Sequence, residues 1–507
     1  MTSLFQTFSD SFQSHGTALT VPGSNPISFP ELKQRIAKLQ STIASFGLDK
    51  GSAIAIVLPN SVEFALTFFA VTYSGYVAAP LNVALKPAEF EFYLADLQCP
   101  IAFVPADKSN GSVLGAAKKT GVKTFVVDTE ANVRDLAGKP VTHGKVNVSS
   151  AQPDDVALVL HTSGTTGRPK IVPLTNNNLS VSIRNIVQTY KLTKSDVSML
   201  VMPLFHVHGL LCGFLAPLSV GAGVIVPTRF HASTFWRDYE AHGATWYTAV
   251  PTIHQILLKS PIPSPVPSIR FIRSCSSALA PSTMRALEKV LHAPVVEAYA
   301  MTEASHQMTS NDLPPGKRKI GSVGRAQGDV AVKILDQAGT EVEQGHEGEI
   351  CVKGGNVTTG YRNNDSANAS SYTSSGFFRT GDQGKVDEDG FVFITGRIKE
   401  LINRGGEKIA PLELDAVMLE HPDVSEAVSF GVPDEMYGQE VHAAIVLKPG
   451  AKVDEKSIQA FVGERVAKFK VPKRIFFVDT MPKTATGKIQ RRNVGEYVSK
   501  MKRSSKL

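Results

Sequence analysis

The stretch of sequence that most constrains this chain runs from Thr162 to Lys170 and reads TSGTTGRPK. It directly follows the apolar segment Val156–Leu160, whose length predicts a buried strand. Two glycines permit tight curvature, so several backbone N–H groups can converge on one anion, and the hydroxyls add further donors. The spacing differs from the Walker phosphate loop, which has four residues between its glycines. A phosphate-binding loop of another kind is predicted, with contacts from Thr162, Ser163, Gly164, Thr165, Thr166, Gly167 and Lys170.

Outward from this loop, apolar segments of strand length alternate with amphipathic segments through the first 400 residues. Ala53–Leu58, Ile101–Val104 and Thr124–Val127 read as strands. Val62–Tyr73 and Leu114–Lys119 read as helices. Such alternation is typical of α/β layers with largely parallel sheets.

The pattern changes from about residue 321, where strand-like segments follow one another with turns such as Asp389-Gly390 between them. After Gly396-Arg397 a smaller unit begins, in which helical and strand-like segments alternate again. The predicted fold is therefore α/β: a large N-terminal body (1–396) of layered β-sheets with helices and an antiparallel β subdomain, then a small α+β C-terminal domain (397–507).

Charge is distributed unevenly along the 507 residues. The formal net charge is +7, yet residues 465–507 hold thirteen Lys and Arg against two acids, so the rest of the chain is net acidic. A basic end predicts a solvated face or a polyanionic ligand such as phosphates. Nucleic acid is disfavoured as that ligand, because no aromatic platform interleaves these lysines.

Composition excludes several classes of protein. A hydrophobic share of 42% with 20% charged residues argues against wholesale disorder, and four dispersed cysteines make no disulfide framework or metal site. Ala65–Leu85 and Val197–Thr228 lack Asp, Glu, Lys and Arg, but glycines and prolines interrupt both. Both segments are predicted to be buried core rather than membrane spans.

Ser505-Lys506-Leu507 ends the chain and matches the peroxisomal address that an import receptor reads at a free carboxyl terminus. The first residues lack the basic region and long apolar run of a signal peptide. We expect a peroxisomal matrix protein; a cytosolic pool stays open.

Four further motifs follow the loop in order: Tyr299-Ala300-Met301-Thr302-Glu303, Arg379-Thr380-Gly381-Asp382, Gly396-Arg397-Ile398-Lys399-Glu400 running to Gly405-Gly406, and Pro482–Lys488. Together with the loop, they resemble the adenylate-forming superfamily of acyl-CoA synthetases, luciferases and peptide-synthetase adenylation domains, over essentially the whole chain. The resemblance implies an ATP-dependent ligase that uses Mg²⁺: a carboxylic acid attacks ATP to give an acyl adenylate and pyrophosphate, and coenzyme A (CoA) then displaces AMP.

The resemblance also implies site residues. Catalysis would fall to Lys488, Thr302, Glu303 and His206, with Lys488 bridging the acid and the α-phosphate. Glu303 and Thr166 would hold Mg²⁺. Besides the loop, the expected ATP contacts are Ala278, Glu297, Ala298, Tyr299 (on adenine), Ala300, Met301, Thr302, Asp382 (on the ribose), Arg397, Lys399 and Lys488.

In the family, the small domain is a mobile cap that rotates between an adenylating pose and a thioester-forming pose. Lys399 matches the hinge. Gly405 and Gly406 would line the CoA tunnel in the second pose, because a narrow passage leaves no room for side chains.

The candidate acid pocket is polar. His206, His208, Ser276, Ser277 and His306 are its expected contacts, and such donors suit a second carboxylate better than an alkyl tail. Among the branches, SCSSALAP, AYAMTEASHQM and GRIKELINRGGEKI look closest to the oxalyl-CoA synthetases, so oxalate is the predicted acid. A medium-chain fatty acid, a 4-coumarate-like acid, a luciferase-like oxygenase and a carrier-protein adenylation domain remain alternatives.

Overall fold

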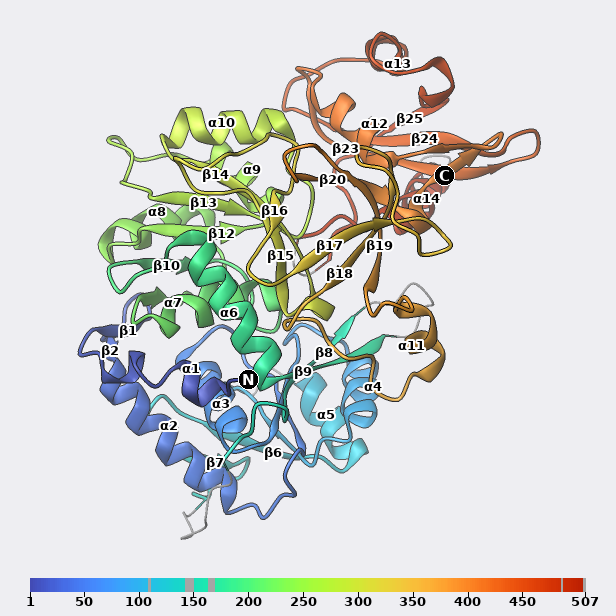
Figure 1. The fold of residues 1–507 in the computed structure, drawn as a ribbon. Coiled ribbons are helices and arrows are strands. Elements are labelled where there is room, and N and C mark those ends of the chain that lie inside the picture. The colour runs from blue at the N-terminus through green and yellow to red at the C-terminus, as the bar shows by residue number, and fades with distance from the viewer. Residues whose placement is uncertain (108–110, 142–149, 163–168, 485–486, 505–507) are drawn as a thin grey trace.

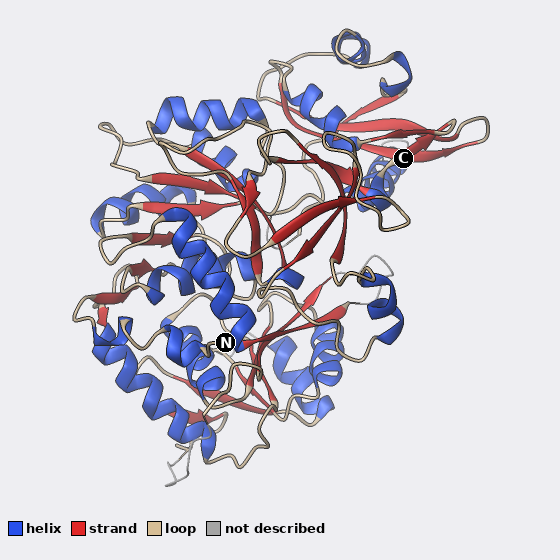
Figure 2. Ribbon diagram, viewed as in Figure 1, coloured by secondary structure: helices blue, strands red, loops and turns tan. Residues whose placement is uncertain are grey.

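The computed structural model describes residues 1–107, 111–141, 150–162, 169–484 and 487–504. Within them the strands form four sheets, and helices cover the two large ones (Figures 1 and 2). A smaller unit built from the last hundred residues lies against one end of this body (Figure 1).

One large sheet carries the predicted phosphate loop. Its core strands are parallel and fully buried, as expected for a sheet with helices on both faces. In described order it runs β7 (Val133–Asp135), β6 (Lys123–Val127), β5 (Ile101–Phe103), β3 (Ala53–Ile56), β4 (Val77–Pro80), β8 (Val156–Thr162) and β9 (Lys170–Thr175). β8 and β9 are antiparallel, and Thr162 pairs with Lys170 at the end of the hairpin where the chain passes from one strand to the other.

The other large sheet builds most of the candidate site. In described order it runs β16 (Arg325–Ala326), β15 (His306–Ser310), β14 (Val295–Met301), β13 (Phe271–Ser274), β12 (Trp246–Ala249), β10 (Val197–Leu200), β11 (Gly223–Ile225), β1 (Thr17–Thr20) and β2 (Ile27–Ser28). From β14 to β1 neighbouring strands are parallel. Their carboxyl ends therefore meet at one edge, where α/β proteins place their ligands.

Two smaller sheets follow. The antiparallel one is formed by β17 (Ala331–Leu335), β18 (Gly348–Lys353), β19 (Phe378–Val386) and β20 (Val392–Arg397). The C-terminal one contains β22 (Glu407–Ile409), β21 (Ile402–Arg404), β24 (Gly438–Leu447) and β23 (Val424–Asp434), with β25 (Arg474–Phe477) parallel to β24.

Helices begin where the sequence provides caps and apolar periodicity. Ser28 and Glu31 form a reciprocal capping box on α2, and Thr175 caps α6 with Asn178. The body helices are α1 (Leu4–Thr7), α2 (Phe29–Ala44), α3 (Val62–Tyr73), α4 (Pro87–Leu97), α5 (Gly111–Thr120), α6 (Asn176–Tyr190), α7 (Ala216–Ser219), α8 (Ala232–Ala241), α9 (Pro251–Lys259), α10 (Pro281–Leu291) and α11 (Asp365–Ser371). The C-terminal unit contains α12 (Pro411–Leu419), α13 (Glu455–Gly463) and α14 (Arg491–Ser504). Five short turns of 3₁₀ or π type are η1 (Ser11–Gln13), η2 (His208–Leu215), η3 (Thr302–Ala304), η4 (Ile398–Glu400) and η5 (Lys468–Lys470) in the described chain.

The predicted fold class is confirmed. The described strands and helices follow the predicted segments, including α3, α5 and the antiparallel subdomain. Residues 65–85 and 197–228 contribute largely buried core, and among the described residues no helix combines the length and apolar character needed to cross a bilayer.

The C-terminal unit has its own apolar cores, whose members begin at Ile402, whereas the described core clusters of the body end at Val392. The division after residue 396 and the mobility of the unit stay predictions. Two hydrogen bonds join the unit to α9: Lys259 Nζ donates to Ser425 Oγ at 2.8 Å, and Thr252 Oγ1 donates to the Gly487 carbonyl at 3.4 Å.

Candidate active site

The parallel strands β12 and β13 end beside the residues predicted to contact the acid. Their register sets Thr248 of β12 beside Arg273 of β13, and Ala249 beside Ser274. Directly after β13 the chain turns sharply at Ser276, whose φ of +74° is uncommon for a residue other than glycine. This turn leaves Ser276 half-buried at the strand edge.

His208 occupies the centre of this cluster. It begins η2 and is fully buried, with Nδ1 3.0 Å from Ser276 Oγ and Nε2 2.6 Å from Thr248 Oγ1. Its ring stacks on His306, with the ring centroids 5.1 Å apart. Burial, reinforced by the nearby Arg273 charge, holds the pKa of His208 well below its usual range. His208 is therefore neutral near pH 7.

His306 enters the cluster from the far side. It begins β15, directly after a turn in which Ser305 and His306 both have positive φ values, of 47° and 89°. Its ring is buried, and its Nε2 has no hydrogen-bond partner among the residues that the structure describes. A buried nitrogen of this kind usually has a partner, so a ligand oxygen would suit it.

His206 lies half-buried just before η2. Its Nδ1 accepts a hydrogen bond from the His208 backbone N–H at 3.2 Å, so in the neutral ring the proton resides on Nε2. Burial and the nearby Lys488 charge lower the pKa of His206 to about 4. The Nε2–H is thus a neutral donor at the junction between body and cap.

Arg273 is a polar residue of this cluster that sequence reasoning missed as a site residue. It is fully buried and contacts His208, Thr248, Tyr190 and Gln307. A charged residue inside the otherwise apolar strand segment before Ser274 is the signal that could have identified it. The predicted Ser277 is also half-buried, and its hydroxyl donates to the Ser276 carbonyl.

The ribose end of the predicted nucleotide site is built from β14, β19 and β20. Asp382 on β19 is buried, accepts a hydrogen bond from the Tyr299 hydroxyl and forms an ion pair with Arg397, whose Nε is 2.8 Å from Asp382 Oδ1. Three residues predicted from separate motifs are thus in direct contact.

Lys488 reaches this same place from the cap. Although its side chain keeps solvent-accessible surface, the surrounding protein lowers the pKa of Lys488, and the Arg397 charge acts in the same direction. Asp382 and Glu400 oppose this shift, while Lys488 in turn lowers the pKa of His206. The charge of Lys488 therefore interacts both with His206, in the predicted acid site, and with Asp382, in the predicted ribose site.

Glu303 lies on η3, one turn before His306. Its buried carboxylate accepts a hydrogen bond from the Tyr361 hydroxyl at 2.9 Å, and Lys170 Nζ lies 4.4 Å from the centroid of the Tyr361 ring. Burial raises the pKa of Glu303. Thr302, the first residue of η3, is half-buried beside it. Tyr361 was missed from the sequence, since no motif marks it.

Part of the predicted nucleotide site is not described. Ser163, Gly164, Thr165, Thr166 and Gly167 lie outside the described residues, whereas Thr162 and Lys170 flank them on paired strands.

The remaining predicted nucleotide contacts lie along β14 and the loop after β13. Ala298, Ala300 and Met301 belong to β14, and Ala278 is exposed. The buried Glu297 accepts the Leu279 backbone N–H at 2.9 Å, and burial raises its pKa to about 8. Glu297 therefore anchors the loop that carries Ser276 to Ala278.

The predicted hinge and CoA residues belong to the start of the cap. Lys399 lies in η4 between Arg397, which pairs with the body, and Glu400, whose Oε2 is 3.3 Å from Arg491 Nε. Gly405 and Gly406 form the turn between β21 and β22 with φ values of 59° and 93°. A Cβ on Gly405 would lie 3.3 Å from the Tyr437 ring, so this turn is packed against its own domain.

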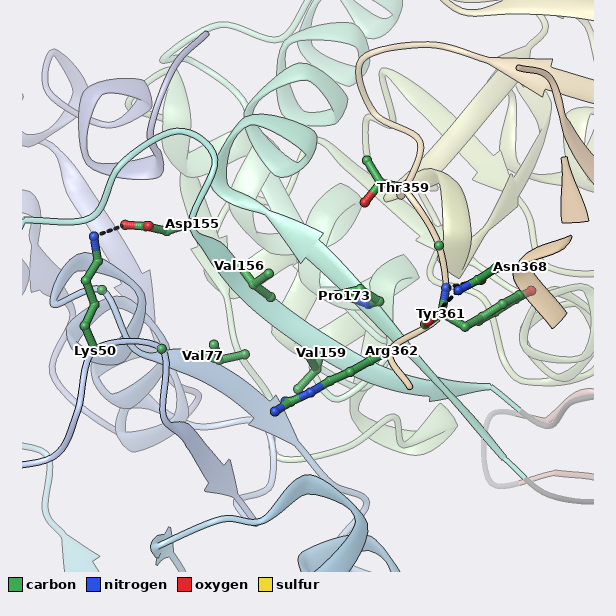
Figure 3. A pocket seen from close by; sticks show the side chains of 13 residues that line it. Lys50, Val77, Asp155, Val156, Val159, Pro173, Thr359, Tyr361, Arg362 and Asn368 are labelled. Atoms are coloured by element: carbon green, nitrogen blue, oxygen red, sulfur yellow. Dashed lines mark hydrogen bonds and ion pairs between the residues drawn. The ribbon is translucent and has the colours of Figure 1, made fainter. Parts of the chain in front are cut away.

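A cavity of about 620 Å³ lies beside the candidate site and contains none of the predicted residues. Figure 3 shows Lys50 paired with Asp155 at one side and Tyr361 with Asn368 at the other, with the Arg362 side chain extending between them. Tyr361 separates this cavity from Glu303, because its hydroxyl is directed to that carboxylate.

The chain matches two protein families: the AMP-binding enzyme family over residues 8–362, and the AMP-binding enzyme C-terminal domain over residues 413–488. An oxalate–CoA ligase of Arabidopsis thaliana is 48% identical over 491 residues, covering 95% of both chains. One of Saccharomyces cerevisiae is 45% identical over 534 residues, covering 99% of this chain and 98% of its own. ATP-bound MatB of Rhodopseudomonas palustris superposes with a TM-score of 0.90 at 30% identity, covering 99% of this chain and all of its own. Its apo form, with the same coverage, gives 0.79, so the ATP-bound arrangement is the more similar.

The buried neutral histidines predict how stability depends on pH. Their folded pKa values lie below the unfolded value near 6.5, so the unfolded chain binds more protons and stability falls as pH drops from about 6.5 towards 4. His306→Gln should reduce this loss by roughly 2 kcal/mol between pH 6.5 and 5, at about 1.4 kcal/mol per pH unit.

Thermal unfolding of the wild type and the variant at both pH values measures this difference. His346→Gln, which changes an exposed histidine, is the control and should follow the wild type. Parallel curves for His306→Gln and wild type would show that His306 has the same pKa in the folded and the unfolded chain, and would contradict the lowered pKa.

Proposed function

Because the chain belongs to the AMP-binding enzyme family of adenylate-forming enzymes, we propose that it joins oxalate to CoA, with oxalyl adenylate as the intermediate. The observation that carries the choice of acid is the polar cluster of the buried His208 and His306 with the half-buried Ser276, in which the His306 Nε2 has no partner among the described residues. An alkyl or aromatic tail would leave the His306 nitrogen unsatisfied and would offer no acceptor to the Ser276 hydroxyl, whereas the oxygens of a small dicarboxylate can pair with both. The names of the full-length relatives support the same acid.

The first step forms a bond from a carboxylate oxygen of the acid to the α-phosphorus of ATP, and the bond to pyrophosphate breaks. Negative charge accumulates on the α-phosphate oxygens, so a cation aimed there lowers the barrier. Lys488 supplies this cation, since its charge acts on His206 at the acid end and on Asp382 at the ribose end. Asp382, held by Arg397 and Tyr299, accepts from the ribose hydroxyls.

The donors for Mg²⁺ fit the residues present. Mg²⁺ prefers one or two carboxylates together with phosphate oxygens and water. Glu303 offers a buried carboxylate of which only one oxygen receives the Tyr361 hydroxyl, and Thr166, outside the described residues, would add a hydroxyl. When bound, the ion neutralises charge on the phosphates. Lys170, whose Nζ lies over the Tyr361 ring, would add a second positive charge for the phosphates.

The second step needs the CoA sulfur to attack the acyl carbon while AMP departs. With Lys488 directed at the acid, the approach to that carbon is occupied from the cap side. We infer that the cap turns about Lys399, that Lys488 withdraws, and that Gly405 and Gly406 then line the path of the thiol. The greater similarity to ATP-bound than to apo MatB supports the adenylating pose for the arrangement described above.

A panel of acids tests the substrate. With ATP, Mg²⁺ and CoA, pyrophosphate release should give a kcat/KM for oxalate at least ~100-fold above that for octanoate or 4-coumarate, because each unpaired buried donor costs about 1–3 kcal/mol. Malonate should fall between them. A preference for octanoate would exclude the oxalate assignment, and light emission without CoA would favour a luciferase-like oxygenase.

Lys488→Ala tests whether Lys488 acts in the adenylation step and not in the thioester-forming step. Removing the cation should lower the rate of adenylation by roughly 10²–10³-fold, the effect typical of losing one preorganised charge-stabilising group. Thioester formation from supplied oxalyl adenylate should change little, since Lys488 has withdrawn by then. Rapid-quench measurements of both half-reactions check this.

The matched control is Lys483→Ala, which removes a lysine of the same motif that pairs with Glu426 at 2.8 Å. Both half-reactions should be retained in it. Equal losses of both steps in Lys488→Ala would contradict the alternating role.

We further propose import into the peroxisomal matrix through Ser505-Lys506-Leu507, which lie outside the described residues. A fluorescent protein fused to the amino terminus should accumulate in peroxisomes. Deleting these three residues should leave it diffuse; unchanged peroxisomal signal after deletion would disprove the assignment.

A further inference from the structure

Arg273 is a buried cation whose hydrogen-bond partners are all neutral. Its Nε donates to the Tyr190 hydroxyl at 2.7 Å, Nη1 lies 3.1 Å from Thr248 Oγ1 and 3.3 Å from His208 Nε2, and Nη2 donates to Gln307 Oε1 at 3.1 Å. Arginines are almost never fully buried unless they are paired with an acid. In the part of the chain that the structure describes, no carboxylate forms an ion pair with Arg273.

The contacts of Arg273 determine where the protons of its neighbours lie. A guanidinium can only donate, so Thr248 Oγ1 and His208 Nε2 accept from it. Thr248 Oγ1 is also 2.6 Å from His208 Nε2, and its hydroxyl hydrogen is the one available for that contact. His208 Nε2 is therefore an acceptor, and the neutral ring carries its proton on Nδ1.

The tautomer of His208 determines the role of Ser276. With its proton on Nδ1, His208 donates to Ser276 Oγ over 3.0 Å. A hydroxyl that accepts this hydrogen bond keeps its own hydrogen for another acceptor. Ser276 is half-buried at the acid end of the site, so that hydrogen is available to an oxygen of the bound acid.

The hydrogen bonds that run from Thr248 through His208 to Ser276 form a relay that favours an acceptor at Ser276. The positive charge of Arg273 also favours a negatively charged group there. A buried cation without a counter-ion is unfavourable in the apo protein, because desolvation is not repaid. An acid with two carboxylates brings one charge for the reacting centre and one for the far end of the pocket, where that second charge offsets Arg273. A neutral group at the far end would leave the cation uncompensated.

We propose that Arg273 is the positioning residue that selects a dianionic acid: it directs the relay from Thr248 through His208 so that Ser276 donates to the far carboxylate, and its own unpaired charge favours that carboxylate. The inference rests on the proposed function, and it assigns Arg273 no contact with the acid.

Oxalate and oxamate form the test pair, because oxamate has the same shape and replaces the far carboxylate by a neutral amide. Pyrophosphate release should show that the wild type prefers oxalate. In Arg273→Met this preference should fall by at least ~30-fold, mostly through a higher KM for oxalate, as expected when a buried charge is removed. Arg285→Met, which changes an exposed arginine of α10, is the control and should behave as wild type.

The proton positions are read independently of any substrate. In ¹⁵N-histidine spectra of the apo enzyme, His208 should be the neutral Nδ1–H tautomer in the wild type and lose this preference in Arg273→Met. Arg273→Lys keeps the positive charge but lacks the planar set of guanidinium donors. It should therefore retain part of the preference for oxalate, while His208 should lose its fixed tautomer. It also serves as the informative variant if Arg273→Met does not fold.

Equal losses for oxalate and oxamate in both variants, with the His208 tautomer unchanged, would overturn the inference and reduce Arg273 to a packing residue. No turnover of oxalate by the wild type would instead refute the proposed function. The tautomer would then still decide whether the relay exists, because its measurement needs no acid.

Discussion

The parallel pairing of β12, β13 and β14 is the constraint on which the site depends. Because parallel strands end at the same edge, Thr248, Arg273 and the Tyr299 motif are brought together although they are spread over 51 residues of the chain. The tight turn after β14 then returns the chain as β15 and brings His306 against His208. One sheet edge thereby holds both the histidine cluster proposed for the acid and the residues predicted to contact the nucleotide.

A second set of contacts joins this edge to the cap. Arg397 pairs with Asp382 on the body, while Glu400, three residues later, pairs with Arg491 of the cap. Lys399 lies between these two ion pairs, so rotation of the cap would change the backbone dihedral angles of the short η4 segment. The basic C-terminal segment is largely balanced within the cap itself: Lys470 pairs with Glu413 and Lys483 with Glu426. Exposed pairs of this kind contribute about 0–1 kcal/mol each. Lys488 differs from these lysines in that its pKa is coupled to Arg397 and Asp382 at the site.

Much of the fold was predictable because buried strands and capped helices leave local patterns. β3 reads as a continuous apolar run, and Ser61 precedes the apolar helix α3 and caps it. The motif residues Asp382, Arg397 and Tyr299 were also predictable as a group, and the structure brings them into contact. Arg273 and Tyr361 were not, because their importance arises from partners distant in the chain and no local pattern encodes those partners.

By itself, the sequence determined the family and the α/β class, since these follow from ordered motifs and from the periodicity of apolar residues; the same motifs predicted which residues contact ATP. Only the tertiary structure decided which polar groups are buried together, away from solvent. Burial turns His206, His208 and His306 into neutral hydrogen-bonding groups, and it leaves Arg273 a cation with no acid paired to it among the described residues. The reason is physical: the cost of a charge and the position of a proton depend on every group packed around them, and packing is a property of the folded chain.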